Sequence, residues 1–209
     1  MSEAEARPVR KTRAPGDRAR ARVAEAAARL ATVEGLDGLS IGRLAEATGV
    51  PKSSVHALFG SKQDLQLATI SAARDSFLAE VVAPAFTSGD PGVARLLAYC
   101  EGFLSYVERR VFPGGCFFVA ISAEVGARRG PVHDEVARVQ DQWRELLLHD
   151  ARAAVERGEL PGEDDPAQLA FELGAILAGA DIVSVLHDDV AVIDRARTAV
   201  RRRLRAGGR

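Results

Sequence analysis

The sequence predicts an all-α protein of about nine helices, and three observations support this prediction. Ala and Leu, which favour helices, are abundant, and runs of β-branched residues are few. Apolar residues recur at three- and four-residue intervals, as on one face of an α-helix. Gly, Pro and N-cap residues divide the 209 residues into segments of helical length. With 47% hydrophobic and 27% charged residues, the chain has the composition of a soluble globular protein.

The amino-terminal segment is predicted to be an arm followed by a helix. Residues 1–16 combine many charges with Pro and Gly and lack an apolar period, so we expect a flexible basic arm. Asp17 is a good N-cap residue for the helix that follows, and Gly35 is suited to end it.

Two short helices and the start of a long one are expected next. Ser40 is the N-cap of the first short helix, which ends at Gly49. The second begins near Lys52 and ends at Gly60. Ser61 then opens the pattern Ser-x-x-Asp, a capping box that predicts the start of a long helix.

The rest of the chain predicts six helices and no convincing strand. Their expected ranges are 62–83, 93–107, 116–127, 132–157, 166–187 and 190–204. The helix at 166–187 is apolar on every side, but it carries Glu172 and Asp181, and a central acid costs about 2.5–3.5 kcal/mol on membrane insertion. The first twenty residues are charged throughout and do not resemble a secretory signal. We therefore expect a cytoplasmic protein with no membrane partner.

Charge is distributed unevenly along the chain. Residues 1–65 hold 11 Lys and Arg against 8 Asp and Glu, whereas residues 66–209 hold 17 against 21. A basic front end on an acidic body suggests an anion-binding module joined to a second unit.

Motifs for catalysis, cofactors and metals are absent from the sequence. There is no Gly-rich phosphate loop and no assembly of nucleophile, base and oxyanion donor. Cys100 and Cys116 form no Cys-x-x-Cys pair, and the four His do not follow a ligand spacing. We predict no catalytic residue, no cofactor and no metal.

The most informative segment is the pair of short helices at residues 40–59. Two helices that meet at a turn of three or four residues containing Gly form a helix-turn-helix. The second helix presents Lys52, Ser53, Ser54 and His56 outward, and short polar side chains there can approach base edges in a major groove. This segment is the candidate for the anion-binding module.

The same residues carry a resemblance to a known family. The capping Ser40, the run Leu44-Ala45-Glu46-Ala47, the Gly49-Val50 turn, Phe59, and Ser61-Lys62-Gln63-Asp64-Leu65 follow one another as in the DNA-binding domain of the tetracycline-repressor (TetR) family. The match covers about residues 17–70, a third of the chain. The remainder resembles that family's ligand-binding and dimerisation domain only in architecture and length. The resemblance implies a helix-turn-helix domain at 17–65 and a helical ligand-binding and dimerisation domain at 66–209.

Roles for individual side chains follow from the helix ends and from this resemblance. Ser40 and Lys62 lie at helix amino termini, which favour phosphate oxygens. His56 stands where the family usually carries a phosphate-binding Tyr. The residues predicted to contact DNA are Ser40, Arg43, Lys52, Ser53, Ser54, His56 and Lys62.

The helical body is expected to hold a hydrophobic effector and to pair with a second copy. The residues predicted to line the effector cavity are Phe103, Tyr106, Phe117, Ile121 and Trp143. The helices at 166–187 and 190–204 are predicted to form a four-helix bundle in a homodimer.

These features predict a dimeric repressor that binds a palindromic operator in double-stranded DNA and is released by a small hydrophobic effector. An alternative is a helical ligand-binding protein or enzyme that does not bind DNA. The sequence does not separate repressor from activator.

Overall fold

The computed structural model of the chain describes residues 15–162 and 165–205, which are helical apart from short loops. The helix bounds are α1 Pro15–Glu34, α2 Ile41–Thr48, α3 Lys52–Phe59, α4 Lys62–Phe77, η1 Leu78–Val82, α5 Ala83–Phe86, α6 Val93–Glu108, α7 Phe117–Val125, α8 Pro131–Glu156, α9 Pro166–Leu186 and α10 Ala191–Arg205. Because α4, η1 and α5 are continuous, the described residues form nine rods and no strand. The predicted all-α fold is confirmed.

The first helix begins earlier than the sequence suggests. It starts at Pro15, two residues before the expected N-cap Asp17. Proline is favoured in a first helical turn because its fixed φ suits the helix and its missing N–H has no partner there. Residues 1–14, most of the predicted basic arm, lie outside the described residues.

The fourth rod also differs from prediction, because Pro84 does not end it. The rod continues to Phe86 through η1, a turn of π-helix in which the Ala83 N–H donates to the carbonyl of Leu78, five residues earlier. Proline in a helix clashes with the carbonyl four residues before it, and a widened turn relieves that clash. The rod therefore runs without a break from Lys62, next to the helix-turn-helix, to Phe86 in the body.

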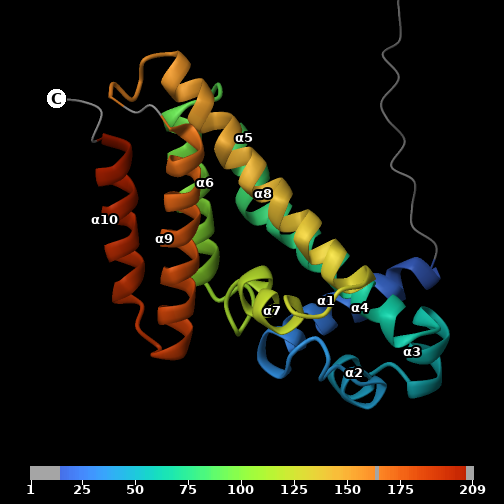
Figure 1. Cartoon of the computed structure of the whole chain (residues 1–209). Coiled ribbons are helices and arrows are strands. Elements are labelled where there is room, and N and C mark those ends of the chain that lie inside the picture. The colour runs from blue at the N-terminus through green and yellow to red at the C-terminus, as the bar shows by residue number, and fades with distance from the viewer. Residues whose placement is uncertain (1–14, 163–164, 206–209) are drawn as a thin grey trace, which may run out of the picture.

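Figure 1 shows how the rods are arranged. Helices α2 and α3 lie at one end of the molecule, with α1 and α4 joining them to the body. Helices α9 and α10 stand as an antiparallel pair at the opposite side, packed on α6 and α8. The predicted DNA-contacting and dimerising parts of the chain are therefore well separated.

An aromatic cluster fills the body between α4, α6 and α8. The ring of Phe77 packs edge-on against Phe103, Tyr106, Phe118 and Trp143, with centroid distances between 5.2 and 6.3 Å. Edge-to-face contacts of this kind stabilise a core beyond the area they bury. Phe77, near the end of α4, thereby connects that rod to the body.

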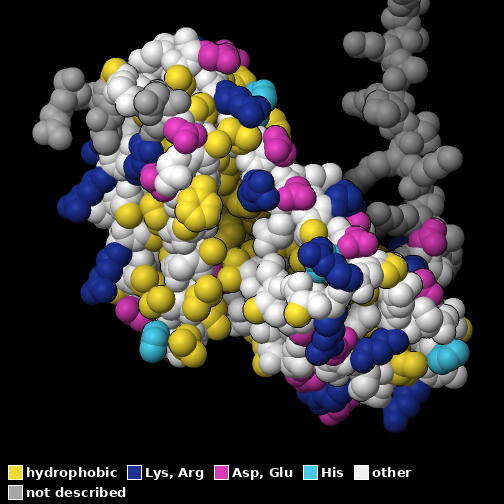
Figure 2. Space-filling view, in the orientation of Figure 1, with side chains coloured by type: hydrophobic (Ala, Val, Ile, Leu, Met, Phe, Trp, Pro, Cys, Tyr) yellow, Lys and Arg dark blue, Asp and Glu magenta, His cyan; other side chains and the backbone are white. Residues whose placement is uncertain are grey.

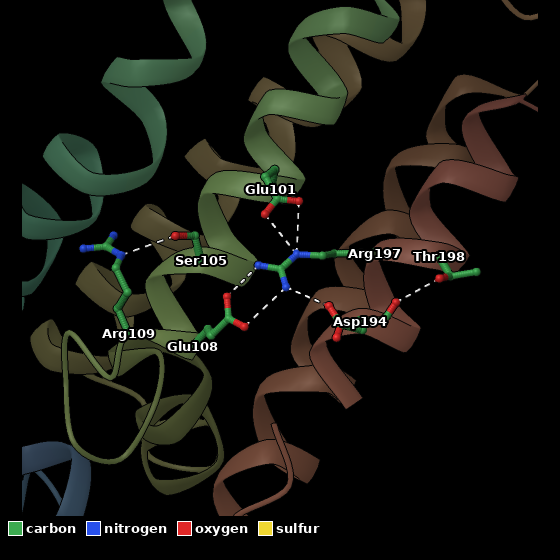
Figure 3. Close-up of polar contacts among 7 residues, drawn as sticks. All are labelled: Glu101, Ser105, Glu108, Arg109, Asp194, Arg197 and Thr198. Atoms are coloured by element: carbon green, nitrogen blue, oxygen red, sulfur yellow. Dashed lines mark hydrogen bonds and ion pairs between the residues drawn. The ribbon is translucent and has the colours of Figure 1, made fainter. Parts of the chain in front are cut away.

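Charged pairs hold the helices of the body in register. The buried Arg95 guanidinium donates twice to the Asp150 carboxylate, at 2.7 Å each, and ties α6 to α8. Arg197 of α10 binds Asp194 on its own helix and reaches Glu101 and Glu108 of α6 (Figure 3). These carboxylates raise the pKa of Arg197. Its guanidinium therefore stays charged, and its ion pairs hold α10 against α6.

Helix α9 is apolar on its solvent side as well as its core side. Among the described helices it alone is long and apolar enough to cross a membrane, with a mean hydropathy of 1.9, and 39% of that stretch is buried. Its exposed side chains include Phe171 at 70% and Leu186 at 73% exposure. Exposed apolar surface of this extent marks an interaction site.

Candidate nucleic-acid interface and effector cavity

The helix-turn-helix has its own small core. Leu44, Val55 and Phe59 are buried where α2 and α3 meet. Gly49 at the turn has φ 68°, a left-handed conformation that side chains other than glycine rarely adopt. Arg20 of α1 donates to the Leu58 carbonyl, and its guanidinium lies 4.7 Å from the centre of the Phe59 ring. Helix α3 is thus fixed against α1.

The amino termini of α2 and α4 face the same cavity of this domain. The Ser40 hydroxyl accepts the Arg43 N–H at 3.3 Å, and the Ser61 hydroxyl accepts the Asp64 N–H at 3.0 Å, so both predicted N-caps are confirmed. Free amides and the positive dipole end at such termini attract anions.

Three of the predicted DNA-contacting residues line one cavity between these termini. Ser40, His56 and Lys62 border a space of about 260 Å³ between α2, α3 and the start of α4. All three side chains are exposed. The Lys62 ammonium donates to the Asp37 carbonyl at 2.7 Å, which holds it at the rim. The arrangement combines hydroxyl, imidazole and ammonium groups that can donate to a phosphate.

The first turn of α3 points away from the body. Lys52, Ser53 and Ser54 are exposed there, as the sequence predicts for a helix that reads a groove. The aliphatic end of Lys52 leans over Gly42, and a methyl group added at Gly42 would lie 3.8 Å from its Cε. Lys52 therefore stands beside the amino terminus of α2.

Arg43 is exposed but already has partners within the chain. Its guanidinium lies 2.5 Å from the Glu34 carboxylate and 3.0 Å from that of Glu46. The hydrogen bond from Arg43 lowers the pKa of Glu34. To contact a phosphate, Arg43 would exchange these acids for the phosphate oxygens.

A carboxylate of the body binds the loop between α1 and α2. The Glu124 side chain, on α7, accepts the Leu36 N–H at 2.8 Å and the Asp37 N–H at 2.7 Å. Gly35 next to it has φ 80°, and a Cβ there would lie 3.2 Å from the Glu124 carboxylate. The sequence analysis did not identify Glu124, because nothing in the sequence pairs α7 with this loop.

A second cavity, of about 510 Å³, lies in the body between α8 and α9. Figure 2 shows it as a hollow with a hydrophobic floor. Of the predicted lining residues, Phe103 and Trp143 border the cavity. Tyr106, Phe117 and Ile121 do not border it and are buried in the core.

Several cavity residues were missed by the sequence analysis. Phe77, Phe118 and Gln140 form part of the wall. The Gln140 amide donates to the Ser122 hydroxyl at 2.9 Å. Phe77 and Phe118 belong to apolar stripes in which core and lining residues look alike, whereas Gln140 interrupts such a stripe and could have been noticed.

Two thiols and one carboxylate are buried in the body, and burial shifts the pKa of each. Burial raises the pKa of Cys116, which lines the cavity, and that of Cys100 to about 12, so both thiols stay protonated. The buried Asp181 carboxylate accepts the Cys116 N–H at 2.9 Å, and burial raises its pKa to about 6. Within the described residues no group of three His, Cys, Asp or Glu could hold a metal ion.

Comparison with known proteins identifies the family. The sequence profile of bacterial regulatory proteins of the tetR family matches residues 23–69, and that of the tetracyclin repressor-like C-terminal domain matches residues 92–200, more than half of the chain. The chain belongs to the tetR family. The predicted family and its type of function, a DNA-binding transcriptional regulator with a helix-turn-helix, are therefore confirmed.

Individual members of the tetR family are similar to this chain. It is 29% identical to the transcriptional regulator AcuR of Cereibacter sphaeroides over 140 residues, which cover 66% of this chain and 64% of AcuR. It is 25% identical to the HTH-type transcriptional repressor ComR of Escherichia coli over 151 residues, 71% of this chain and 70% of ComR. A TetR regulator structure from Chloroflexus aurantiacus superposes with a TM-score of 0.80 and 28% identity, covering 88% of this chain and 93% of that one.

Proposed function

We propose that this protein is a dimeric repressor that binds a palindromic operator and is released by a small hydrophobic effector. The observation that carries the proposal is the joint opening of the α2 and α4 amino termini beside Ser40, His56 and Lys62, with the outer face of α3 exposed next to them. We assign DNA binding to residues 17–65 and effector binding and dimerisation to residues 66–209.

Within this proposal each DNA-contacting residue has a defined task. Ser40, His56 and Lys62 bind backbone phosphates, with Arg43 exchanging its carboxylate partners to join them. Lys52, Ser53 and Ser54 lie along base edges in the major groove. This division predicts that phosphate contacts set affinity, whereas α3 sets sequence preference.

The solvent face of α9 supports the dimer. Two recognition helices enter successive major grooves only when they lie about 34–36 Å apart, which a two-fold pair achieves on a palindrome. Covering α9 with a second copy removes its exposed apolar side chains from water. The same pairing accounts for an apolar helix in a protein that we place in the cytoplasm.

The cavity between α8 and α9 supports an effector of hydrophobic character. Its aromatic wall includes Phe77 of α4, the rod that begins at the helix-turn-helix. An effector that prefers one position of this rod shifts the spacing of the two recognition helices and changes DNA affinity. Repression is favoured over activation because ComR is a named repressor. We propose no enzymatic activity.

Selection of bound oligonucleotides from a random pool tests the proposal. A palindromic consensus is expected. The affinity of the protein for DNA should fall steeply as the salt concentration increases. A chain that retains no duplex at any salt concentration would instead be a helical ligand-binding protein or enzyme.

Variants separate the two kinds of contact. Lys62→Ala should weaken binding to every sequence and reduce the salt dependence by about one ion, whereas Ser54→Ala should alter the selected consensus. Arg152→Ala, an exposed change on α8 at a position that borders neither cavity, is the matched control and should leave both properties unchanged. A Lys62→Ala variant that selects a different consensus, or that keeps the wild-type salt slope, would refute the phosphate assignment.

A further inference from the structure

The cavity between α8 and α9 is not closed by the chain itself. Its rim includes the exposed side chains of Arg144 and Glu145 on α8 and of Phe171 and Ala175 on α9. The Phe171 ring is 70% exposed although it borders the cavity. An apolar ligand in this cavity would therefore remain in contact with water along the α9 side of the rim.

The α9 side of the rim is the beginning of a longer apolar face. Phe171 and Ala175 are followed at helical spacing by Gly179, Ile182 and Leu186, all exposed. The exposed fractions of Ile182 and Leu186 are 52% and 73%. Between residues 173 and 186 the helix carries one charged side chain, Asp181, which is turned inward and buried. Whatever covers this face also reaches the rim.

The charges that flank this face suit a second copy of the chain. The carboxyl end of α9 leads into Asp188 and Asp189. At the other end of the face, the amino end of α9 lies beside the carboxyl end of α10, joined by the Arg203–Glu172 ion pair. Exposed arginines gather there, at positions 201, 202 and 205. A two-fold axis that makes the paired α9 helices antiparallel places the acidic end of each copy at the basic end of the other.

We infer that the effector cavity is a shared site, whose open side is closed by α9 of the partner subunit. The inference rests on the proposed dimer and deepens it, because the partner then forms part of the effector site. Small residues at 174, 175, 178 and 179 allow a second helix to approach closely enough to cover the rim. A ligand that fills the cavity touches both subunits, so its binding and the pairing of subunits stabilise each other.

The single tryptophan of the chain reports on this closure directly. Trp143 lines the cavity, and the sequence contains no second tryptophan whose fluorescence would obscure its signal. Collisional quenching of Trp143 by acrylamide measures how freely a small solute enters the cavity. The full chain is used, without any ligand, and its association state is measured in parallel by analytical ultracentrifugation.

Ile182→Arg and Leu186→Arg interrupt the pairing without touching the cavity, since neither residue borders it. Each variant should be a monomer with unchanged circular dichroism, and its quenching constant should rise several-fold above that of the wild-type dimer. Val33→Arg, at a site on α1 that is 67% exposed, is the matched control and should leave both measurements unchanged.

The outcomes distinguish this inference from the function proposed above. A folded monomeric variant with wild-type quenching would overturn the shared site and leave the dimer and its DNA binding in place. A wild-type protein that is monomeric at all concentrations would overturn the shared site and the dimer together. Loss of DNA selection with intact dimerisation and closure would refute only the assignment of the helix-turn-helix.

Discussion

Replacing Glu124 with alanine should destabilise the protein at the contact between α7 and the loop that joins α1 to α2. The carboxylate accepts the N–H groups of Leu36 and Asp37, and Leu36 is fully buried. A hydrogen bond to a charged group contributes about 1.5–3 kcal/mol, and less where water can replace it, as at the exposed Asp37. Together the two bonds predict a loss of about 2–4 kcal/mol in the free energy of unfolding.

Urea denaturation followed by circular dichroism measures this loss, and hydrogen exchange locates it. The Leu36 and Asp37 amides should exchange faster in Glu124→Ala, while amides in α9 should be affected only through global unfolding. Glu124→Gln, which keeps an accepting oxygen, should lose about half as much. Glu135→Gln, a similar change in the Arg138 ion pair, is the control and should remain within about 0.5 kcal/mol of wild type.

A value for Glu124→Ala within about 0.5 kcal/mol of wild type would refute this reasoning. It would mean that water satisfies both amides as well as the carboxylate does. Glu124 would then not couple the loop between α1 and α2 to α7, and the coupling between the effector cavity and the helix-turn-helix would depend on α4 and on the other contacts of α1 with the body.

Three further changes probe the charges of the body. Because the pKa of Asp181 is raised, the free energy of unfolding falls as pH rises from about 4 to about 6. Asp181→Asn should therefore increase the free energy of unfolding by about 1–3 kcal/mol at pH 7.5 and by almost nothing at pH 4. Equal shifts of the urea midpoint at both pH values would contradict this. Arg95→Met removes the guanidinium from the buried Asp150 carboxylate and leaves it the exposed His149 imidazole as a partner, which should cost about 3–5 kcal/mol by thermal or urea unfolding; Arg95→Met with Asp150→Leu should restore most of this loss. Arg197→Met should cost about 1–2 kcal/mol, more at low salt than at high salt, and a salt-independent loss would show that packing of the side chain outweighs its charge.

Local sequence rules predicted the helix-turn-helix well. Ser40 and Ser61 act as N-caps, and Gly49 makes the turn, because these roles depend on residues within four positions of one another. The exposure of Lys52, Ser53 and Ser54 follows from the same short-range periodicity.

Contacts between distant segments could not be predicted in this way. Glu124 meets residues almost ninety positions earlier, and no spacing rule connects them. The prediction that Tyr106, Phe117 and Ile121 line the cavity rested on their apolar character, which core and cavity residues share. The π-helical turn before Pro84 relieves a local clash, but a proline can equally end a helix, so the sequence alone does not distinguish the two outcomes.

The continuity of the rod from Ser61 to Phe86 limits how this protein can be recombined with its relatives. A junction after residue 65 would cut a helix whose next residues, Gln66, Thr69 and Ile70, are buried. Each residue inserted or removed at such a junction rotates the helix-turn-helix domain by about 100° around the helix axis and shifts it by about 1.5 Å along that axis. Chimaeras that exchange DNA-binding heads should therefore preserve the length of this helix to the residue, even where the sequences joined are unrelated.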